Sequence, residues 1–448
     1  MKAYLLLLVL VVASVCKIRA QWSELGGYNG LNNNYFLPTI CSDPTGNIYA
    51  GGHLVDSSGN MYVANWNGAS WIKLSGIDIS MGNVNIFASC TDPSGNLFVG
   101  GTIRTAANKF YVAQWDTTAG WIETGGPTGI NANEAIYALC SDPSGNIYAG
   151  GGFRDGQDNR YVSMWNGSSW AMLGDPIGMG DVMALCSDAA GNIYAGGSFI
   201  DSTNHTYVVK WNGGGWSRLG NLDELAEFGI IRSLCSDANG MIYAAGDFYD
   251  STGNTYVAKW NGVSWSRLGG DTGLITSTLS ILSLCTDPAG NIYAAGSFKN
   301  AAGLRYVAKW DGTAWSELGG ASALSATNRI LSICADPTGN IYAAGEFLNG
   351  VQPYVAKYTS PVSGIFTLQQ DNVLKVYPNP AHDVLNLQFD KAIEAEVILT
   401  DMTGRIISAY TVHGIERQLN VATLSAGGYL LVVKTVTGDK CIKRFFKE

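Results

Sequence analysis

Two stretches of the sequence define a repeating unit. Residues 281–298 read ILSLCTDPAGNIYAAGSF, and residues 306–320 read YVAKWDGTAWSELGG. Both contain short runs rich in β-branched and aromatic residues, which favour strands. Asp-Pro-x-Gly-Asn separates the first two runs and Asp311-Gly312 separates the last two, and both are tight-turn signals. The unit therefore predicts four strands, at residues 281–286, 291–298, 306–310 and 315–318.

This unit occurs seven times along the chain. The aspartate of its Cys-x-Asp element recurs at nearly even steps, namely at Asp43, Asp92, Asp142, Asp188, Asp237, Asp287 and Asp336. A period of about 50 residues that is built of short β segments is typical of a propeller with one four-stranded blade per repeat. The first run of each unit is apolar on both faces, as expected for a strand between neighbouring blades.

The tryptophans indicate how the ring of blades closes. Six units contain a pair of tryptophans, whereas the seventh has Tyr358 in the first position and then ends. The missing partner is Trp22, because the spacing from Trp22 to Cys41 equals the spacing from Trp315 to Cys334. The sequence therefore predicts an all-β fold: a seven-bladed β-propeller over residues 21–358, closed by its N-terminal strand, with all 13 tryptophans in the scaffold.

The repeats are similar to those of a known class of protein. They resemble bacterial β-propeller repeats with an Asp-x-x-Gly-Asn-x-Tyr core and, more loosely, kelch repeats. The resemblance implies the fold but no activity, because propellers carry many unrelated functions.

Composition and charge exclude several classes of function. Glycine accounts for 56 of the 448 residues and charged residues for only 14%, which suits a protein of many tight turns. The net charge is −9, and residues 21–359 carry 15 positive against 27 negative side chains. Binding to nucleic acid needs clustered lysine and arginine, so no nucleic-acid partner is expected. The sequence contains no P-loop, Gly-x-Ser-x-Gly or His-Glu-x-x-His motif.

The N-terminal segment, residues 1–20, predicts a secretory signal peptide. A basic start precedes an apolar run from Ala3 to Val15, which is shorter than the roughly 20 residues of a membrane-spanning helix. We expect cleavage after Ala20; the alternative is a lipoprotein with its lipid on Cys16. No later apolar run approaches the length of a span, so none is expected in the mature chain.

The C-terminal part has a different pattern. Residues 359–370 read as a linker, and residues 371–448 predict a small Ig-like β-sandwich from alternating apolar residues and turn dipeptides. Three elements occur in order: Tyr377-Pro378-Asn379-Pro380 with Asp383, a hairpin with Gly404-Arg405, and Leu424-x-x-Gly427-x-Tyr429.

These elements resemble the type A C-terminal sorting domain of the bacterial type IX secretion system. The resemblance implies that the type IX machinery is a partner. It also implies export through the periplasm of a Gram-negative bacterium, followed by release or attachment at the outer cell surface.

Residues that repeat in every blade are expected to be structural. Adjacent blades pack about 10 Å apart, whereas the Cα atoms of a disulfide lie within about 7 Å. The seven repeat cysteines are therefore predicted to be free core residues: Cys41, Cys90, Cys140, Cys186, Cys235, Cys285 and Cys334. Each repeat aspartate is expected to cap its own turn. A calcium ring is the alternative for the aspartates, and no other metal or cofactor is expected.

Function is expected where the blades differ. The loops between the second and third strands vary, among them those with Arg104 and Arg154, and they share a face with the loops between blades. One position after the second strand also varies, and we call its members the ring positions: His53, Thr102, Gly152, Ser198, Asp247, Ser297 and Glu346. Directed at the central opening, they would form a polar ring; the alternative is solvated loop ends.

The sequence favours a monomeric, non-enzymatic module for adhesion or for capture of a glycan or protein. The candidate binding residues are His53, Asp247, Glu346, Arg104 and Arg154. The alternative is a propeller glycosidase or lyase with Asp247 and Glu346 as its acid/base pair, which requires two carboxylates about 5–10 Å apart. A third interpretation is a structural component of the cell surface.

Overall fold

The fold was analysed in a computed structural model of the chain. The structure describes residues 21–448 except 28–30, 32–35, 57–60, 78–83, 127–128, 176, 179, 202–204, 221–224, 226–228, 251, 271–273, 275, 278, 351, 360–373, 402–405 and 436–439. The predicted signal peptide and most of the predicted linker lie outside the described residues. The chain forms two compact units that divide between Ser360 and Pro361.

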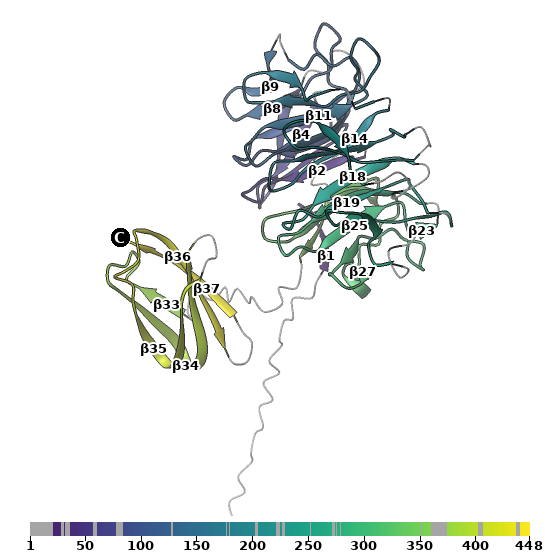
Figure 1. Cartoon of the computed structure of the whole chain (residues 1–448). Helices are drawn as coiled ribbons and strands as arrows, with labels where there is room; N and C mark the ends of the chain where they lie inside the picture. The colour runs from purple at the N-terminus through teal and green to yellow at the C-terminus, as the bar shows by residue number, and fades with distance from the viewer. Residues whose placement is uncertain are drawn as a thin grey trace, which may run out of the picture. The chain divides into compact units, whose positions relative to one another are not determined.

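The N-terminal unit confirms the predicted propeller. It consists of seven antiparallel sheets of four strands each (Figure 1). The innermost strands pack side by side around a central channel, each against the next and the last against the first. They are β2 (Thr39–Ser42), β6 (Ile86–Thr91), β10 (Ile136–Ser141), β14 (Val182–Ser187), β18 (Ile231–Ser236), β24 (Ile281–Thr286) and β28 (Ile330–Ala335).

The other strands follow outward in sequence order. The second strands are β3 (Ile48–Gly51), β7 (Leu97–Gly101), β11 (Ile147–Gly151), β15 (Ile193–Gly197), β19 (Ile242–Gly246), β25 (Ile292–Gly296) and β29 (Ile341–Gly345). The third are β4 (Met61–Trp66), β8 (Ala113–Asp116), β12 (Ser163–Trp165), β16 (Val209–Trp211), β21 (Ala258–Trp260), β26 (Ala308–Trp310) and β32 (Ala356–Thr359). The outermost are β5 (Trp71–Ile77), β9 (Gly120–Glu123), β13 (Trp170–Met172), β17 (Trp216–Arg218), β22 (Trp265–Arg267), β27 (Trp315–Glu317) and β1 (Gln21–Glu24).

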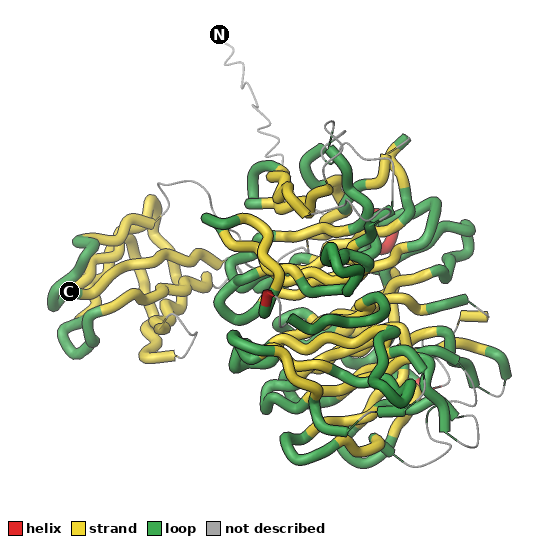
Figure 2. Tube along the Cα trace, turned by 90° about the horizontal axis from the view of Figure 1, so that it is seen from above, coloured by secondary structure: helices red, strands yellow, loops and turns green. Residues whose placement is uncertain are grey.

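Short elements complete the unit. Two small two-stranded sheets pair β20 (Asn254–Thr255) with β23 (Thr276–Ser277) and β30 (Leu348–Asn349) with β31 (Gln352–Pro353). The 3-10 turn η3 covers Gly320–Ser322. Nearly all of the described chain is strand or loop (Figure 2). No helix in the described ranges is long and apolar enough to cross a membrane.

The N-terminal strand closes the ring as predicted. β1 pairs antiparallel with β32 and forms the outer strand of the seventh blade, with Trp22 opposite Tyr358. In Figure 1 the purple β1 lies among the green strands of the last blades. The indole N–H of each outermost tryptophan also donates to a backbone carbonyl of the preceding blade, at 2.7–3.2 Å. These bonds are Trp22 to Leu318, Trp71 to Leu25, Trp121 to Leu74, Trp170 to Thr124, Trp216 to Leu173, Trp265 to Leu219 and Trp315 to Leu268.

The C-terminal unit is also all-β, with one strongly bent sheet. Its described strands are β33 (Leu374–Tyr377), β34 (Val384–Asp401), β35 (Ile406–Asn420), β36 (Gly427–Thr435) and β37 (Lys440–Lys447). The alternating pattern predicts about seven short strands. Five are found because β34 continues past a register shift between Gln388 and Ile393 and pairs with β33, β35 and β36. The bent sheet encloses a core that includes Leu385, Leu399 and Phe445.

Candidate functional site

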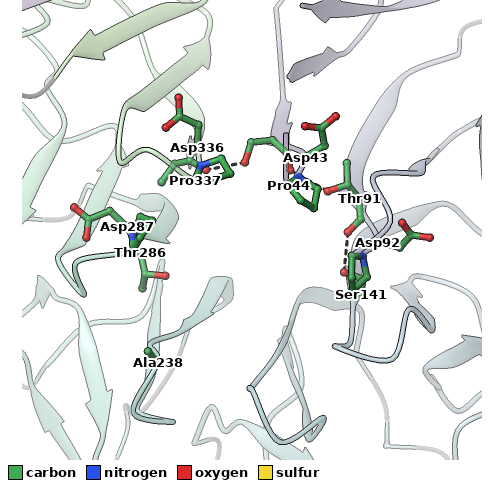
Figure 3. Close-up of a pocket in the computed structure, with 14 residues that line it drawn as sticks. Asp43, Pro44, Thr91, Asp92, Ser141, Ala238, Thr286, Asp287, Asp336 and Pro337 are labelled. Atoms are coloured by element: carbon green, nitrogen blue, oxygen red, sulfur yellow. Dashed lines mark hydrogen bonds between the residues drawn. The ribbon is translucent and has the colours of Figure 1, made fainter. Parts of the chain in front are cut away.

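The two ends of the central channel differ in chemistry. At the end with the turns between first and second strands, hydroxyl groups of neighbouring blades form a chain of hydrogen bonds at 2.7–3.2 Å. The bonds run from Ser42 to Ala335, Thr91 to Ser42, Ser141 to Thr91, Ser187 to Ser141, Ser236 to Ser187 and Thr286 to Ser236, each from hydroxyl to backbone carbonyl. They border an open cavity of ≈ 480 Å³ (Figure 3). We call this the constant end.

The repeat aspartates accept hydrogen bonds within their own turns. Asp43 Oδ1 accepts from the backbone N–H groups of Thr45 and Asn47 at 2.9 and 3.0 Å, and Oδ2 accepts from the Asn47 side chain and the Tyr49 hydroxyl. Burial alone would raise the pKa of Asp43, but the hydrogen bonds from Thr45 and Asn47 outweigh it and hold the pKa below its ordinary value. Figure 3 shows the carboxylates of Asp43, Asp92, Asp287 and Asp336 turned away from the middle of the cavity.

That orientation does not fit the alternative of a calcium ring. The carboxylate oxygens are used inside each turn, so they do not converge on a common point. Among the residues that the structure describes, no group of three or more histidine, cysteine or acidic side chains is placed to hold a metal ion.

The repeat cysteines are free thiols. Cys90, Cys140 and Cys186 are buried, and the other four are partly buried. Burial raises the pKa of Cys41 to about 12 and raises the pKa of the other repeat cysteines as well. A buried, protonated thiol is a poor nucleophile and a poor metal ligand, so these cysteines act as small core residues.

The opposite end of the channel, which we call the variable end, carries six residue types at one equivalent position of the seven blades. The second position of each innermost strand, or its equivalent in the first blade, borders a cavity of ≈ 250 Å³. The residues at this position are Pro38, Phe87, Tyr137, Met183, Arg232, Leu282 and Leu331. The Phe87 and Tyr137 rings pack with their centroids 6.0 Å apart. Deeper in the channel, Leu139, Leu185, Leu234 and Leu284 narrow the cavity.

The ring positions lie beside this mouth. In the second to seventh blades, their backbone N–H groups donate to the carbonyl of the residue just before the innermost strand. Thr102 and Ser198 use their hydroxyls to accept from the backbone N–H groups of Asn85 and Asp181, both at 2.8 Å. His53 Nδ1 lies 2.7 Å from the Val84 carbonyl oxygen.

The two acidic ring positions are each engaged by an arginine of their own blade. Asp247 Oδ2 lies 2.6 Å from Arg232 Nη2, and Glu346 Oε2 accepts from Arg329 Nε at 2.8 Å. Asp247 is in the fifth blade and Glu346 in the seventh, with the sixth blade between them. The carboxylates are therefore oriented by separate partners rather than by each other.

The two loop arginines named from the sequence lie near the same end. Arg104 donates to the Asn108 side chain at 2.9 Å and stacks over the Phe110 ring, 4.3 Å from its centroid. Arg154 pairs with Asp158 at 2.7 Å and with Glu134 at 3.4 Å. Each guanidinium is thus fixed by its own blade.

Several residues of the variable end were not singled out from the sequence. Phe87, Tyr137 and Arg232 belong to innermost strands whose mostly apolar pattern predicts core residues rather than a binding surface. A usable signal does exist: this position differs from blade to blade, while the cysteine that follows it in the same strand is constant.

The sorting motif of the C-terminal unit connects its first and last strands. The Asn379 side-chain oxygen accepts from the backbone N–H of Phe446 at 2.8 Å, and Ala381 pairs with Lys447. Asp383 accepts through its backbone carbonyl from the N–H of Val421 at 2.8 Å. Tyr377, Pro378 and Pro380 are exposed.

The later motif elements are only partly described. Tyr429 stacks on Phe445, with ring centroids 5.6 Å apart, and donates through its hydroxyl to the Ser425 carbonyl. Gly427 begins β36 with a φ of +153°. Gly404 and Arg405 lie outside the described residues.

A family model decides the nature of this unit. The model described as "Secretion system C-terminal sorting domain" matches residues 375–448. The C-terminal unit is a type IX secretion sorting domain. This domain directs the chain to secretion or to the cell surface. No curated protein matches the chain significantly.

Solved structures support the fold of the remaining chain. The extracellular domain of the hybrid two-component system BT3049 from B. thetaiotaomicron is 13% identical, with a TM-score of 0.51 over 96% of this chain and 57% of that one. A fungal alcohol oxidase of the AA5 family, in complex with copper, is 14% identical, with a TM-score of 0.51 over 95% of this chain and 98% of that one. At these identities the similarity shows the fold alone.

A third structure comes from the type IX secretion system itself. PorZ, a surface component of that system in Porphyromonas gingivalis, is 16% identical, with a TM-score of 0.49 over 94% of this chain and 60% of PorZ. The chain thus spans about 60% of the length of PorZ and of BT3049.

Proposed function

We propose that the propeller is a non-enzymatic binding module that captures a glycan or protein ligand at the variable end of its channel. The contrast between the channel ends carries this proposal. At the constant end, equivalent residues of the blades form the same bonds, whereas at the variable end seven equivalent positions hold six residue types, with leucine in both the sixth and the seventh blade. Diversity at one end of an otherwise repetitive scaffold is typical of a recognition surface.

The side chains of the variable end are held in place before any ligand arrives. The Asp247 carboxylate fixes Arg232, and the Phe87 and Tyr137 rings pack on each other. Because such groups lose little conformational freedom on binding, they favour affinity and specificity. His53, Arg104, Arg154, Asp247 and Glu346 surround or extend this surface in the proposal.

The geometry gives no support to the glycosidase or lyase alternative. An acid/base pair needs two carboxylates that face one substrate bond. Asp247 and Glu346 instead face separate arginines in different blades. A structural role at the cell surface would leave the variation at the channel mouth without a purpose.

We propose that residues 1–20 are removed first and that the sorting domain, residues 371–448, then directs export. The propeller of residues 21–358 then acts as a monomer, since β1 completes the last blade. We propose that residues 359–370 link the two domains.

A binding screen tests the proposal. The chain from Gln21 to Glu448 is applied to a glycan array and to a panel of bacterial and host surface proteins. Each hit is repeated with Tyr137→Ala, at the variable end, and with Val263→Ser, a matched surface control that is 80% exposed. We expect a ligand whose binding is lost in Tyr137→Ala and kept in Val263→Ser. A ligand whose affinity is unchanged in both Tyr137→Ala and Arg232→Ala would contradict the proposed site.

A further inference from the structure

One blade departs from the others at the variable end. Gly152, in the third blade, is the one ring position without a side chain. Its backbone does not require glycine, because its φ lies outside the left-handed range that favours this residue. The preceding Gly151 is different, since a Cβ there would lie 2.1 Å from the Ala135 carbonyl oxygen.

Three side chains from two blades converge over Gly152. An ideal Cβ at this residue would lie 3.3 Å from Glu134 Cβ, 3.5 Å from Tyr137 Cε2 and 3.6 Å from Asp181 Oδ1. The Tyr137 ring, the Asp181 carboxylate and the Cβ of Glu134 therefore lie around one point beside the channel mouth. A larger side chain at residue 152 would force them apart.

Arginines neutralise and orient both carboxylates. Arg160 Nη2 lies 3.0 Å from Asp181 Oδ1, and Arg154 Nη2 lies 3.4 Å from Glu134 Oε1. The side chains of Glu134 and Asp181 remain 47% and 34% exposed, so both can still accept hydrogen bonds from a ligand. Burial, and then the charges of Asp181 and Glu134, raise the pKa of Tyr137, so its hydroxyl stays a donor at neutral pH.

The third blade also lacks a hydroxyl that two neighbouring blades have at this point. In the second and fourth blades, Thr102 and Ser198 accept from the N–H of the residue 17 positions earlier. The equivalent N–H in the third blade belongs to Ala135, and Gly152 has no hydroxyl to accept from it.

These groups point to a neutral sugar. We infer that Tyr137, Glu134, Asp181, Arg154 and Arg160 form a subsite for one neutral pyranose ring of a glycan. An aromatic face takes the C–H face of the ring, while paired carboxylates and guanidinium groups bond to its hydroxyls. An anionic ligand would meet three carboxylates against two guanidinium groups, because Arg154 pairs with both Asp158 and Glu134 and Arg160 pairs with Asp181. An apolar ligand would leave the polar groups without partners.

Tyr137 connects the subsite with the channel. It also borders the cavity of ≈ 250 Å³ at the variable end, whose lining residues include none of the other four subsite residues. This inference rests on the proposed function, because it assigns a ligand class to the same end of the channel.

Titration with monosaccharides tests the subsite. The chain from Gln21 to Glu448 is titrated with D-glucose, D-galactose, D-mannose, L-fucose and N-acetyl-D-glucosamine, and binding is followed by saturation-transfer NMR and calorimetry. We expect at least one to bind with a millimolar Kd, and the Kd to rise at least about tenfold in Gly152→Gln. Gly156→Gln is the matched control, since a Cβ at Gly156 meets no atom within 4 Å.

A second variant distinguishes loss of the subsite from a folding defect in Gly152→Gln. Glu134→Gln keeps the size of an exposed side chain and should weaken binding severalfold, with an unchanged Tm. Absence of binding by every one of these neutral pyranoses, or an affinity that neither Gly152→Gln nor Glu134→Gln lowers, would overturn the inference. If the array yields a ligand that Tyr137→Ala abolishes but Gly152→Gln leaves intact, the subsite is wrong and the proposed function stands.

Discussion

The indole nitrogen of Trp22 donates a hydrogen bond of 3.0 Å to the backbone carbonyl of Leu318, 296 positions away. This bond joins the N-terminal strand to the sixth blade, while β1 itself pairs with the seventh. The first residues after the predicted cleavage site are therefore part of the scaffold rather than a tail.

Replacement of Trp22 should weaken the whole propeller. Trp22 is buried, so Trp22→Ala should lower the free energy of unfolding by ~3–5 kcal/mol. Trp22→Phe keeps an aromatic ring but loses the bond to Leu318. The free energy of unfolding should therefore fall by about 1 kcal/mol in addition to any loss of packing. Urea denaturation followed by tryptophan fluorescence measures both. A change below about 0.5 kcal/mol in Trp22→Ala would contradict closure by β1.

The turn aspartates should stabilise the blades without a metal. Asp336 accepts from the backbone N–H groups of Thr338 and Asn340 and from the Tyr342 hydroxyl. Asp336→Ala should lower the free energy of unfolding by ~1–3 kcal/mol at pH 7, and Asp336→Asn, which keeps one acceptor oxygen, by less. Thermal unfolding with added calcium and with a chelator should give the same Tm. A Tm that falls with the chelator would instead favour the calcium ring.

The same aspartate should contribute to acid unfolding. Burial would raise the pKa of Asp336, but hydrogen bonds from Asn340 and Thr338 outweigh burial and hold it below the ordinary 3.8. The contribution of the carboxylate is therefore present above about pH 4 and is lost as the pH falls through the folded-state pKa. Asp336→Asn should unfold with a shallower pH dependence below pH 4. An unchanged acid transition would contradict this assignment.

The repeat cysteines should resist thiol reagents. Burial raises the pKa of Cys41 to about 12, against an ordinary value of 9.0. In a Cys441→Ser variant that begins at Gln21, the buried Cys90, Cys140 and Cys186 should react with Ellman's reagent only after denaturation, and the four partly buried repeat thiols should react far more slowly than in the denatured chain. Rapid labelling of the native protein would show that the blades open.

Alkaline pH should also destabilise the propeller. Because the folded-state pKa of Cys41 is raised, the protonated thiol makes its full contribution to the free energy of unfolding below pH 9. That contribution declines as the pH rises from 9 toward 12. Each such thiol contributes a slope of about 1.4 kcal/mol per pH unit within that window. Cys41→Ala should reduce the slope in denaturation measured across the window, and an identical slope would contradict the buried titration.

Export should depend on the contact between the motif and the last strand. Asn379 accepts from the Phe446 backbone N–H, so Asn379→Ala should loosen β37 and retain protein in the periplasm. His382→Ala, at the variable position of the same motif, is the control, because its side chain is 74% exposed and its partner Glu448 lies beyond the end of β37. Immunoblots of periplasm, cell surface and medium measure the distribution. Normal export of Asn379→Ala would show that export does not depend on this hydrogen bond.

Local chemistry made the fold predictable from the sequence. Asp-Pro-x-Gly and Asn-Gly turns determine strand ends locally, and the spacing of Trp22 from Cys41 revealed ring closure. The ion pair of Arg232 with Asp247 could not be predicted, because it depends on the register between β18 and β19 and the irregularity between Ile231 and Ser233. The same limit applies to β34, whose continuation past Gln388 depends on pairing with three strands.

The central claim is that a ligand binds at the variable end of the channel. Hydrogen–deuterium exchange tests it most directly, with the strongest ligand from the array compared against the free protein. The account predicts slower exchange in peptides that contain Phe87, Tyr137 and Arg232, and no change in the Asp-Pro turns at the constant end. Protection confined to the turns that contain Asp43 and Asp336, or to the sorting domain, would contradict it.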